Sequence, residues 1–225
     1  MSETMIHAGG PVAVQVLDEH GWTQGTYDNN GAMCLHGVLR RCTPVPGDAY
    51  LIEQVEAHHG RWSTDWNDAE GRTADEVRAV LAAGWDITDE DLAATFGPQW
   101  RAVVGLVRRA AILTPNEAKR LRAAWDAARD AAGGAARGAA WDAAGDAARV
   151  AAGDAAGDAA RDAAGDAAWD AAWAAARDAA VAVVTWDLAT DDGPYLLAHR
   201  DLLVGPWVEV CGLPEGLIER EDVQR

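Results

Sequence analysis

The residues best suited to metal chemistry lie in the first third of the chain. Thiol and imidazole groups, the usual zinc ligands, occur at five positions: Cys34, His36, Cys42, His58 and His59. Their Cys-x-His…Cys spacing is not that of a common zinc module, and the sequence contains no Cys-x-x-Cys pair. We therefore expect Cys34 to be a small buried residue and the histidines to be solvated, with no metal and no other cofactor.

The other candidates for chemistry are acidic residues and a histidine nearby. Four residues carry groups that act as general acids and bases: His20, Asp65, Asp68 and Glu70. Nothing in their spacing fixes the distances between them, so capping roles at the surface are favoured over catalysis. Asn67 and Asp68 are expected to cap the turn into the helix after Thr73. The sequence also lacks a Walker loop, Gly-x-Ser-x-Gly and His-Glu-x-x-His.

Capping chemistry predicts where the helices that carry these residues begin. Thr73 and Glu76 fit a capping box, and the helix they open should run to residue 83 and end at Gly84. Thr88 precedes three acidic residues, and Thr114-Pro115-Asn116-Glu117 has Thr, Pro and Glu at favoured helix-start positions. Further helices are expected over 12–19, 33–41 and 48–58. No long stretch alternates with period two, so the predicted fold is mainly α.

An alanine-rich repeat dominates the second half of the sequence. From residue 123 to 180 the unit x-Asp-Ala-Ala recurs every four residues. Alanine favours helix, but a four-residue period drifts about 40° per repeat, so one long helix would have no fixed apolar face. We therefore expect several short helices, broken best at Gly133-Gly134 and packed closely through alanine and glycine. Five tryptophans should supply the missing bulk: 125, 141, 169, 173 and 186.

Composition divides the chain and limits its partners. We expect a disordered start (1–10), a small helical domain (11–83), connecting helices (84–112), an alanine-rich helical repeat domain (113–212) and a charged tail (213–225). The net charge of −17 disfavours direct binding to nucleic acid or to an anionic membrane. No apolar run is long enough for a transmembrane helix, and no secretory signal is visible. An odd number of cysteines, three, favours a reducing cytoplasm over a disulfide scaffold.

Two short segments have the form of a fixed motif. The first joins Gly21-Trp22-Thr23-Gln24-Gly25 to Gly31-Ala32-Met33-Cys34-Leu35-His36-Gly37, and the second joins Trp66-Asn67-Asp68 to Gly71-Arg72-Thr73. Over residues 12–83 this pattern resembles a family of small uncharacterised proteins from actinobacteria and their phages, although Val38 stands where that family has alanine. The alanine-rich half resembles alanine-rich phage proteins and, more weakly, alanine-rich immunity proteins. Neither resemblance implies a known activity.

Three functions remain open at this point. The favoured prediction is a non-enzymatic helical protein of phage or actinobacterial origin that binds a protein partner or itself, with five motif residues as candidates for contact: Trp22, Gln24, Asn67, Asp68 and Arg72. The first alternative is an acidic mimic of nucleic acid that occupies a DNA-binding protein of the host through Asp158, Asp162 and Asp166. The second is a small enzyme, which requires one pocket containing His20, Cys34, Asp68 and Arg72.

Overall fold

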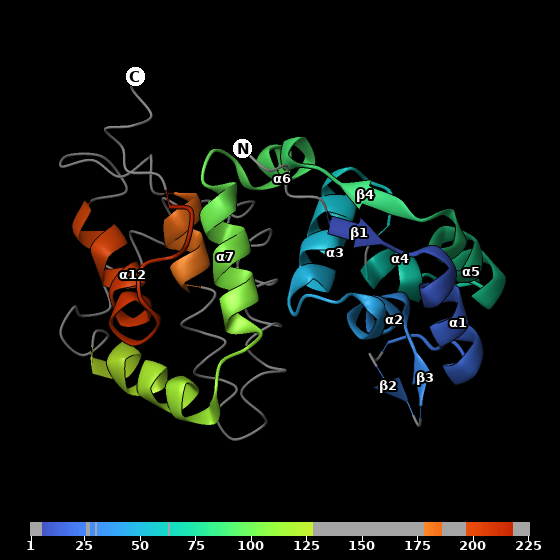
Figure 1. Cartoon of the computed structure of the whole chain (residues 1–225), viewed down its shortest axis with the longest axis horizontal. Helices are drawn as coiled ribbons and strands as arrows, with labels where there is room; N and C mark the ends of the chain where they lie inside the picture. The colour runs from blue at the N-terminus through green and yellow to red at the C-terminus, as the bar shows by residue number, and fades with distance from the viewer. Residues whose placement is uncertain are drawn as a thin grey trace. The chain divides into compact units, whose positions relative to one another are not determined.

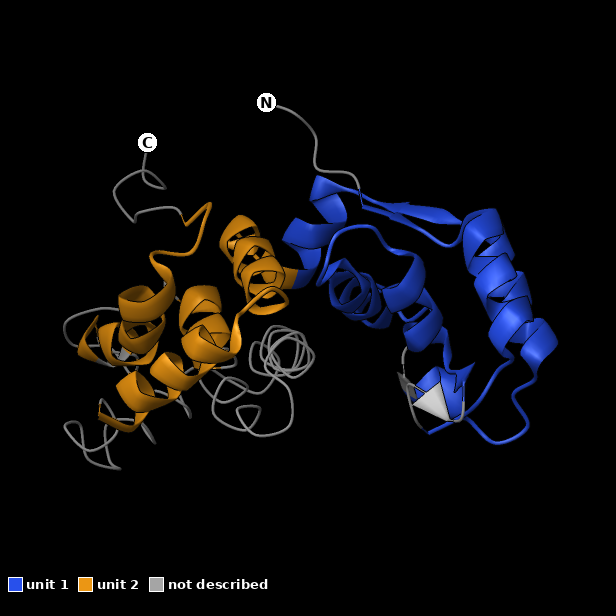
Figure 2. Ribbon diagram, turned by 60° about the horizontal axis from the view of Figure 1, so that its bottom comes forward, with its two compact units in different colours: residues 1–95 blue, residues 96–225 orange. Residues whose placement is uncertain are grey.

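A computed structural model describes residues 6–25, 28–29, 31–62, 64–127, 178–185 and 197–217 of the chain. The chain divides into two compact units, residues 1–95 and 96–225 (Figure 2). Composition had instead suggested boundaries after residues 83 and 112. The described residues are mainly helical, which confirms the predicted fold class.

Unit 1 packs short helices around one apolar core. Its elements in order are β1 (Ile6–Ala8), α1 (Gly10–His20), β2 (Asp28–Asn29), β3 (Ala32–Met33), α2 (Leu35–Cys42), α3 (Asp48–His58), α4 (Thr64–Asp68), α5 (Ala74–Ala83), β4 (Trp85–Ile87) and α6 (Asp89–Phe96) (Figure 1). Helix α1 packs on α2 and α5, and α2 packs on α3. As expected for one apolar face, Leu51, Ile52 and Val55 of α3 are fully buried.

A small antiparallel sheet joins the first and last parts of unit 1. Strand β1 pairs with β4, with Ile6 opposite Ile87 and Ala8 opposite Trp85. Residues 6–8 had been assigned to a disordered start, but two alternate side chains, Ile6 and Ala8, are buried and the strand is ordered by its distant partner. Gly9 permits the close crossing that follows, because a Cβ there would lie 2.6 Å from the carbonyl oxygen of Leu81.

The capping box predicted at Thr73 is present. The Thr73 hydroxyl accepts a hydrogen bond from the backbone N–H of Glu76, whose carboxylate accepts one from the N–H of Thr73, and α5 ends at Gly84 as expected. The same reciprocal pair forms between Thr88 and Asp91 at the start of α6. Each such cap contributes about 1 kcal/mol of stability.

Helix α2 begins two residues later than expected. Residues 32–33 form strand β3 instead of the first turn, because the N–H of Met33 donates to the carbonyl of Gly21 and the N–H of Thr23 donates to the carbonyl of Met33. Cys34 is therefore the N-cap of α2. The motif segment 21–25 is thereby held beside the start of this helix.

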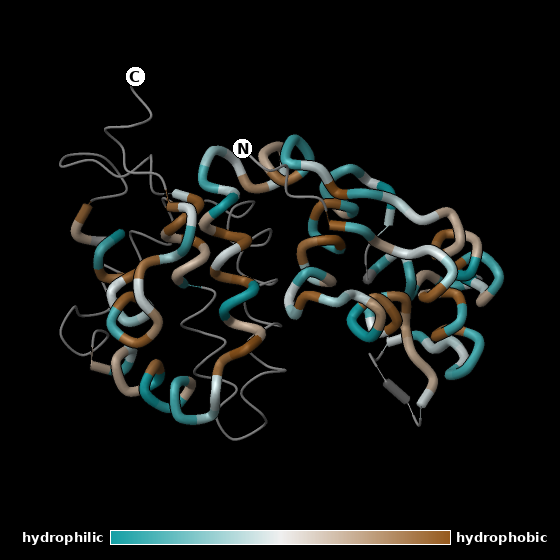
Figure 3. Tube along the Cα trace, viewed as in Figure 1, coloured by the Kyte–Doolittle hydropathy of each residue, from teal (hydrophilic) through white to brown (hydrophobic). Residues whose placement is uncertain are grey.

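The described part of unit 2 contains α7 (Trp100–Ala110), a helix over 115–127, a helix over 178–184 and α12 (Leu197–Cys211). Hydrophobic residues recur along α7 (Figure 3), and its buried residues include Val103, Leu106 and Val107. The helix at 115 begins as predicted, since Thr114 and Glu117 exchange hydrogen bonds between side chain and backbone N–H. Helix α12 continues through Pro206.

The described residues include only the start of the alanine tract. There Trp125 is 4% exposed and shares the buried face of its helix with Ala118 and Leu121. Most of the tract, residues 128–177, lies outside the described residues, as do the tryptophans at 141, 169, 173 and 186. The breaks expected at Gly133-Gly134 lie outside them too.

Within the part of the chain that the structure describes, no helix combines the length and apolar character needed to cross a membrane.

Candidate functional site

Asn67 connects three parts of unit 1. Its side chain is 2% exposed, and Oδ1 accepts hydrogen bonds from Trp22 Nε1 at 3.0 Å and from the backbone N–H of Leu35 at 3.1 Å. Its Nδ2 donates to Asp68 Oδ1 at 2.7 Å. One amide on α4 therefore fixes the 21–25 loop and the first residue of α2 at the same time.

The 21–25 loop is also tied to the end of α4. Gln24 Nε2 donates to the backbone carbonyls of Asn67 and Ala69, at 3.1 and 3.0 Å. The N–H of Gly25 donates to Asp68 Oδ1 at 2.9 Å. These bonds join residues that are 43 to 45 positions apart in the sequence, so they bring the two halves of the motif together.

Arg72 is held against Trp66 of α4. Its guanidinium lies over the Trp66 ring, 3.8 Å from the centroid, and its Nε donates to the Trp66 carbonyl at 3.1 Å. Its Nη1 pairs with Glu76 Oε1 at 2.9 Å. Both partners are fixed in turn by α4 and by the cap of α5, so the guanidinium is held in one place.

We call this group the Asn67 cluster: Trp22, Gln24, Trp66, Asn67, Asp68 and Arg72. Asn67 is buried, Trp22, Trp66 and Arg72 are half-buried, and Gln24 and Asp68 are exposed. The structure thus brings together all five candidate residues of the N-terminal motif and adds Trp66, which the sequence marked only as part of a motif. The other candidates, Asp158, Asp162 and Asp166, lie outside the described residues.

Asn67 and Asp68 do not cap the helix for which they were predicted. They were predicted to cap the turn before α5, but Thr73 makes that cap with Glu76. Asn67 instead satisfies the backbone N–H of Leu35, at the start of α2. The amide therefore serves a helix that precedes it in sequence by 32 residues.

Cys34 is a buried N-cap, as the expectation of a small buried residue requires. It is 4% exposed, and its Sγ accepts a hydrogen bond from the N–H of Gly37 at 3.3 Å. Burial raises the pKa of the thiol, and the carboxylates of Glu53 and Asp68 raise it further, against the lowering effect of two backbone N–H groups. The thiol is therefore kept in its protonated form, which is the weak nucleophile.

His36 corrects the expectation that the histidines are solvated. It is 2% exposed, and its Nδ1 contacts Glu53 Oε2 of α3, whose side chain is 8% exposed. The centroids of the Tyr50 and His36 rings lie 4.5 Å apart. The guanidinium carbon of Arg40 lies over the Tyr50 ring, 5.6 Å from its centroid. Sequence analysis missed Glu53 and Tyr50, although their spacing of three residues in a predicted helix places them on one face.

The remaining candidates for chemistry do not join this pair. His59 Nε2 lies 3.2 Å from Asp91 Oδ1, and the Cys42 thiol donates to the Leu39 carbonyl. Throughout the described residues, no group of three or more His, Cys, Asp or Glu side chains is arranged to hold a metal ion. Nor does any hydrogen bond or ion pair seen among these residues join His20 to Cys34, Asp68 or Arg72, the set that the enzyme hypothesis requires.

Comparison with known proteins gives one match. The model of a family of unknown function (DUF6197) matches residues 12–87, about a third of the chain. No curated protein and no solved structure matches the chain. The matched segment begins at Val12, the third residue of α1, ends with β4 at Ile87 and contains the whole Asn67 cluster. The N-terminal part of this protein is therefore similar to an uncharacterised domain, DUF6197.

Proposed function

We propose that this is a non-enzymatic protein of phage or actinobacterial origin that acts in the cytoplasm by binding a protein through the Asn67 cluster. The observation that carries the proposal is the hydrogen bonding that joins two motif segments, 21–25 and 66–72, at α4. Trp22, Gln24 and Gly25 bond to Asn67 and Asp68, and Arg72 bonds to the carbonyl of Trp66.

The composition of the cluster suits recognition. Tryptophan and arginine contribute most of the binding energy at many protein interfaces, and Trp22, Trp66 and Arg72 are all partly exposed here. Their positions are fixed before binding, because each is hydrogen-bonded or stacked within the unit. A surface ordered in advance loses little conformational entropy on association.

The reactive groups of the unit support the same proposal. The Cys34 thiol is buried and held protonated, and His36 and Glu53 contact each other inside the core. These groups stabilise the start of α2 and its packing on α3. The net charge of −17 favours a partner with a basic contact surface, because long-range attraction speeds the encounter.

The test compares two substitutions of the same kind within unit 1. Arg72→Gln removes the guanidinium that covers Trp66, whereas Arg78→Gln removes an exposed guanidinium that pairs with Asp18 outside the cluster. Wild type and both variants are used as bait in host cells, and the bound proteins are quantified by mass spectrometry. We expect a partner that wild type and Arg78→Gln recover equally and that Arg72→Gln loses.

A second copy of the chain is the other partner to be tested. Light scattering of wild type and Arg72→Gln shows whether a dimer forms and whether it depends on the cluster. A wild-type protein that is monomeric and captures nothing from the host would overturn the proposal. A partner that is retained fully by Arg72→Gln would place recognition elsewhere in the chain.

A further inference from the structure

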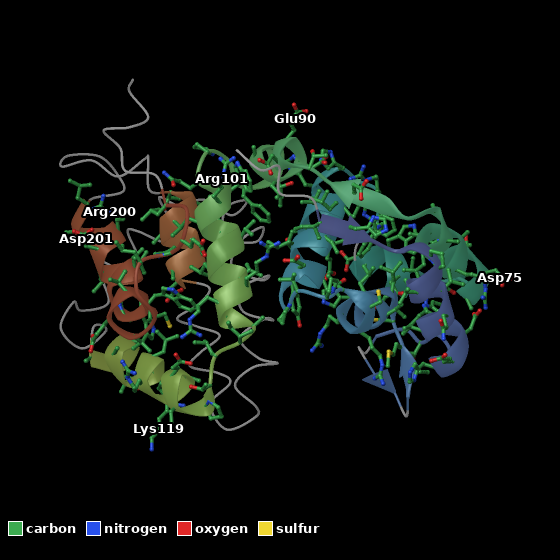
Figure 4. The ribbon with its side chains drawn as sticks, viewed as in Figure 1. Asp75, Glu90, Arg101, Lys119, Arg200 and Asp201 are labelled. Carbon is green, nitrogen blue, oxygen red and sulfur yellow. The ribbon has the colours of Figure 1, made fainter. Side chains whose placement is uncertain are left out.

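Residues 212–217 run along α7 in unit 2. We call them the strap. They follow the last residue of α12, Cys211, and pass α7 toward its N-terminal end, where Arg101 is labelled in Figure 4. Pro214 is buried, whereas Leu213 is 64% exposed and Glu215 and Gly216 are exposed. The strap is therefore a surface segment that is anchored at few points.

Two glycines, one on each side, permit the contact. A Cβ at Gly105 in the middle of α7 would lie 2.8 Å from the carbonyl oxygen of Glu215. A Cβ at Gly216 would lie 2.6 Å from the Cβ of Arg101, and the φ of +81° at Gly216 also favours glycine. A side chain at either position would push the strap away from the helix.

The strap makes no hydrogen bond to α7 within the described residues. The N–H of Gly212 donates back to Val208 of α12, and the N–H of Leu217 donates to the carbonyl of Pro214 inside the strap itself. Gly212 has a φ of +85° and is exposed, and no atom of the described residues lies within 4 Å of the position that a Cβ would take there. Van der Waals packing therefore holds the strap on α7, at Pro214 and at the two glycine contacts.

We propose that the strap is a releasable cover on α7, which leaves the helix without unfolding unit 2. When it is closed, the backbone between Glu215 and Gly216 lies against α7 and cannot enter the active site of a protease. When it is open, the face of α7 that contains Arg101 and Gly105 is uncovered, and Pro214 is exposed with it. The opening is a conformational device of unit 2 and is independent of the Asn67 cluster.

Gly105→Ala separates this proposal from a purely structural role. Alanine is the better helix former, so the substitution stabilises α7 itself and its only new contact is with the strap. A releasable strap predicts two results together: the strap opens, and the thermal midpoint of unit 2 is unchanged or higher. A strap that is integral to the core predicts a lower midpoint.

The matched control is Gly205→Ala in α12. A Cβ at Gly205 meets no atom within 4 Å, so the same substitution in a helix of the same unit leaves the strap in place. Gly216→Ala serves as the second variant, because it disturbs the contact from the strap side and leaves the sequence of α7 intact.

Opening is measured by cleavage of the full chain with a glutamyl endoprotease, following the Glu215–Gly216 bond by fragment mass. Because such cleavage follows the population of the open form, we expect Gly105→Ala and Gly216→Ala to accelerate it by about tenfold or more, and Gly205→Ala to leave it unchanged. In wild type the rate should vary little with low concentrations of urea, since local opening exposes little surface. A rate that rises with urea as steeply as global unfolding, or that is the same in all three variants, would overturn the proposal.

Discussion

The two units fix their structures by different means. Unit 1 uses a few polar side chains that form hydrogen bonds across 43 to 45 residues of sequence, with Asn67 at their centre. In unit 2 the contact between α7 and residues 212–217 is made where side chains are missing, at Gly105 and Gly216. Unit 1 therefore depends on single polar groups as well as on the bare backbone at Gly9, whereas this contact in unit 2 depends on the absence of a Cβ at two glycines.

The difference decides which kind of substitution each unit tolerates. A buried hydrogen bond that loses one partner leaves the other partner unsatisfied, which costs about 1–3 kcal/mol for each group. An added methyl at a glycine contact displaces whatever lies opposite, and the cost depends on whether that segment can move. Loss of a buried acceptor in unit 1 should thus lower the stability of that unit, whereas an added methyl at the glycine contact in unit 2 should displace the strap.

The largest expected effect is in unit 1. Asn67→Ala leaves the indole N–H of Trp22 and the backbone N–H of Leu35 without an acceptor, and we expect a loss of about 3 kcal/mol from the free energy of unfolding. Hydrogen exchange of the α2 amides measures it. Asn116→Ala, at an exposed position in the helix over 115–127, is the control and should change stability by less than about 0.5 kcal/mol. Equal effects from the two would show that Asn67 is not the central contact.

The next effect should be equal in the two units. Thr73→Ala and Thr114→Ala each remove the hydroxyl of a capping box, and we expect each to cost about 1 kcal/mol, because the same two hydrogen bonds are lost. Hydrogen exchange in α5 and in the helix over 115–127 reports the two losses separately. A much larger loss from Thr114→Ala would indicate that unit 2 depends on local helix stability more than its packing suggests.

Acid should weaken the capping box formed by Thr114 and Glu117. Hydrogen bonds from the backbone and hydroxyl of Thr114, with a smaller effect of Arg109, lower the pKa of Glu117 from 4.5 to about 2. A carboxylate whose folded pKa is lowered stabilises the fold fully above its ordinary pKa, and this stability is lost as the pH falls from 4.5 toward 2. Unfolding of unit 2 measured across this range should therefore show a slope that Glu117→Gln flattens. A slope that is unchanged in the variant would exclude Glu117 as its source.

The smallest signal is expected from the thiols. Burial raises the pKa of Cys34 in unit 1, and burial raises the pKa of Cys211 in unit 2 to about 11, so neither is a thiolate at neutral pH. Cys211 is half-buried, whereas Cys34 is 4% exposed. Alkylation of the native protein should thus be slow at Cys211 and slower still at Cys34, as followed by peptide mass. Rapid labelling of Cys34 would show an open, activated thiol and would favour the enzyme hypothesis.

Local chemistry made much of the fold predictable. The starts at Thr73, Thr88 and Thr114 and the limits of α3 follow from capping residues and from apolar spacing, which act within a few positions of the sequence. Strands β1 and β4 could not be predicted in the same way. Each has three residues, too few to show a period, and each is ordered by a partner at the other end of the unit.

The sequence motifs contain the residues of the Asn67 cluster, but they do not predict the hydrogen bonds between them. The motif segments made Trp22, Gln24 and Asn67 candidates, and the structure joins the three by hydrogen bonds. The hydrogen bond from the N–H of Leu35, at the start of α2, to the Asn67 amide could not be predicted. It joins residues 35 and 67, and no local pattern in the sequence indicates that contact. The contact at Gly105 could not be predicted for the same reason. From sequence alone, a glycine inside a helix indicates only lower helix stability, and its neighbour Glu215 is distant in the sequence.

The pairing of Ile6 with Ile87 has a consequence for how unit 1 can be handled. The segment from Ile6 to Ile87 begins and ends at neighbouring positions, so insertion of this segment into a surface loop of a carrier protein would strain neither backbone. A few linking residues between these two positions would likewise close the backbone into a ring, from which new ends can be opened at an exposed turn such as the one at Gly60.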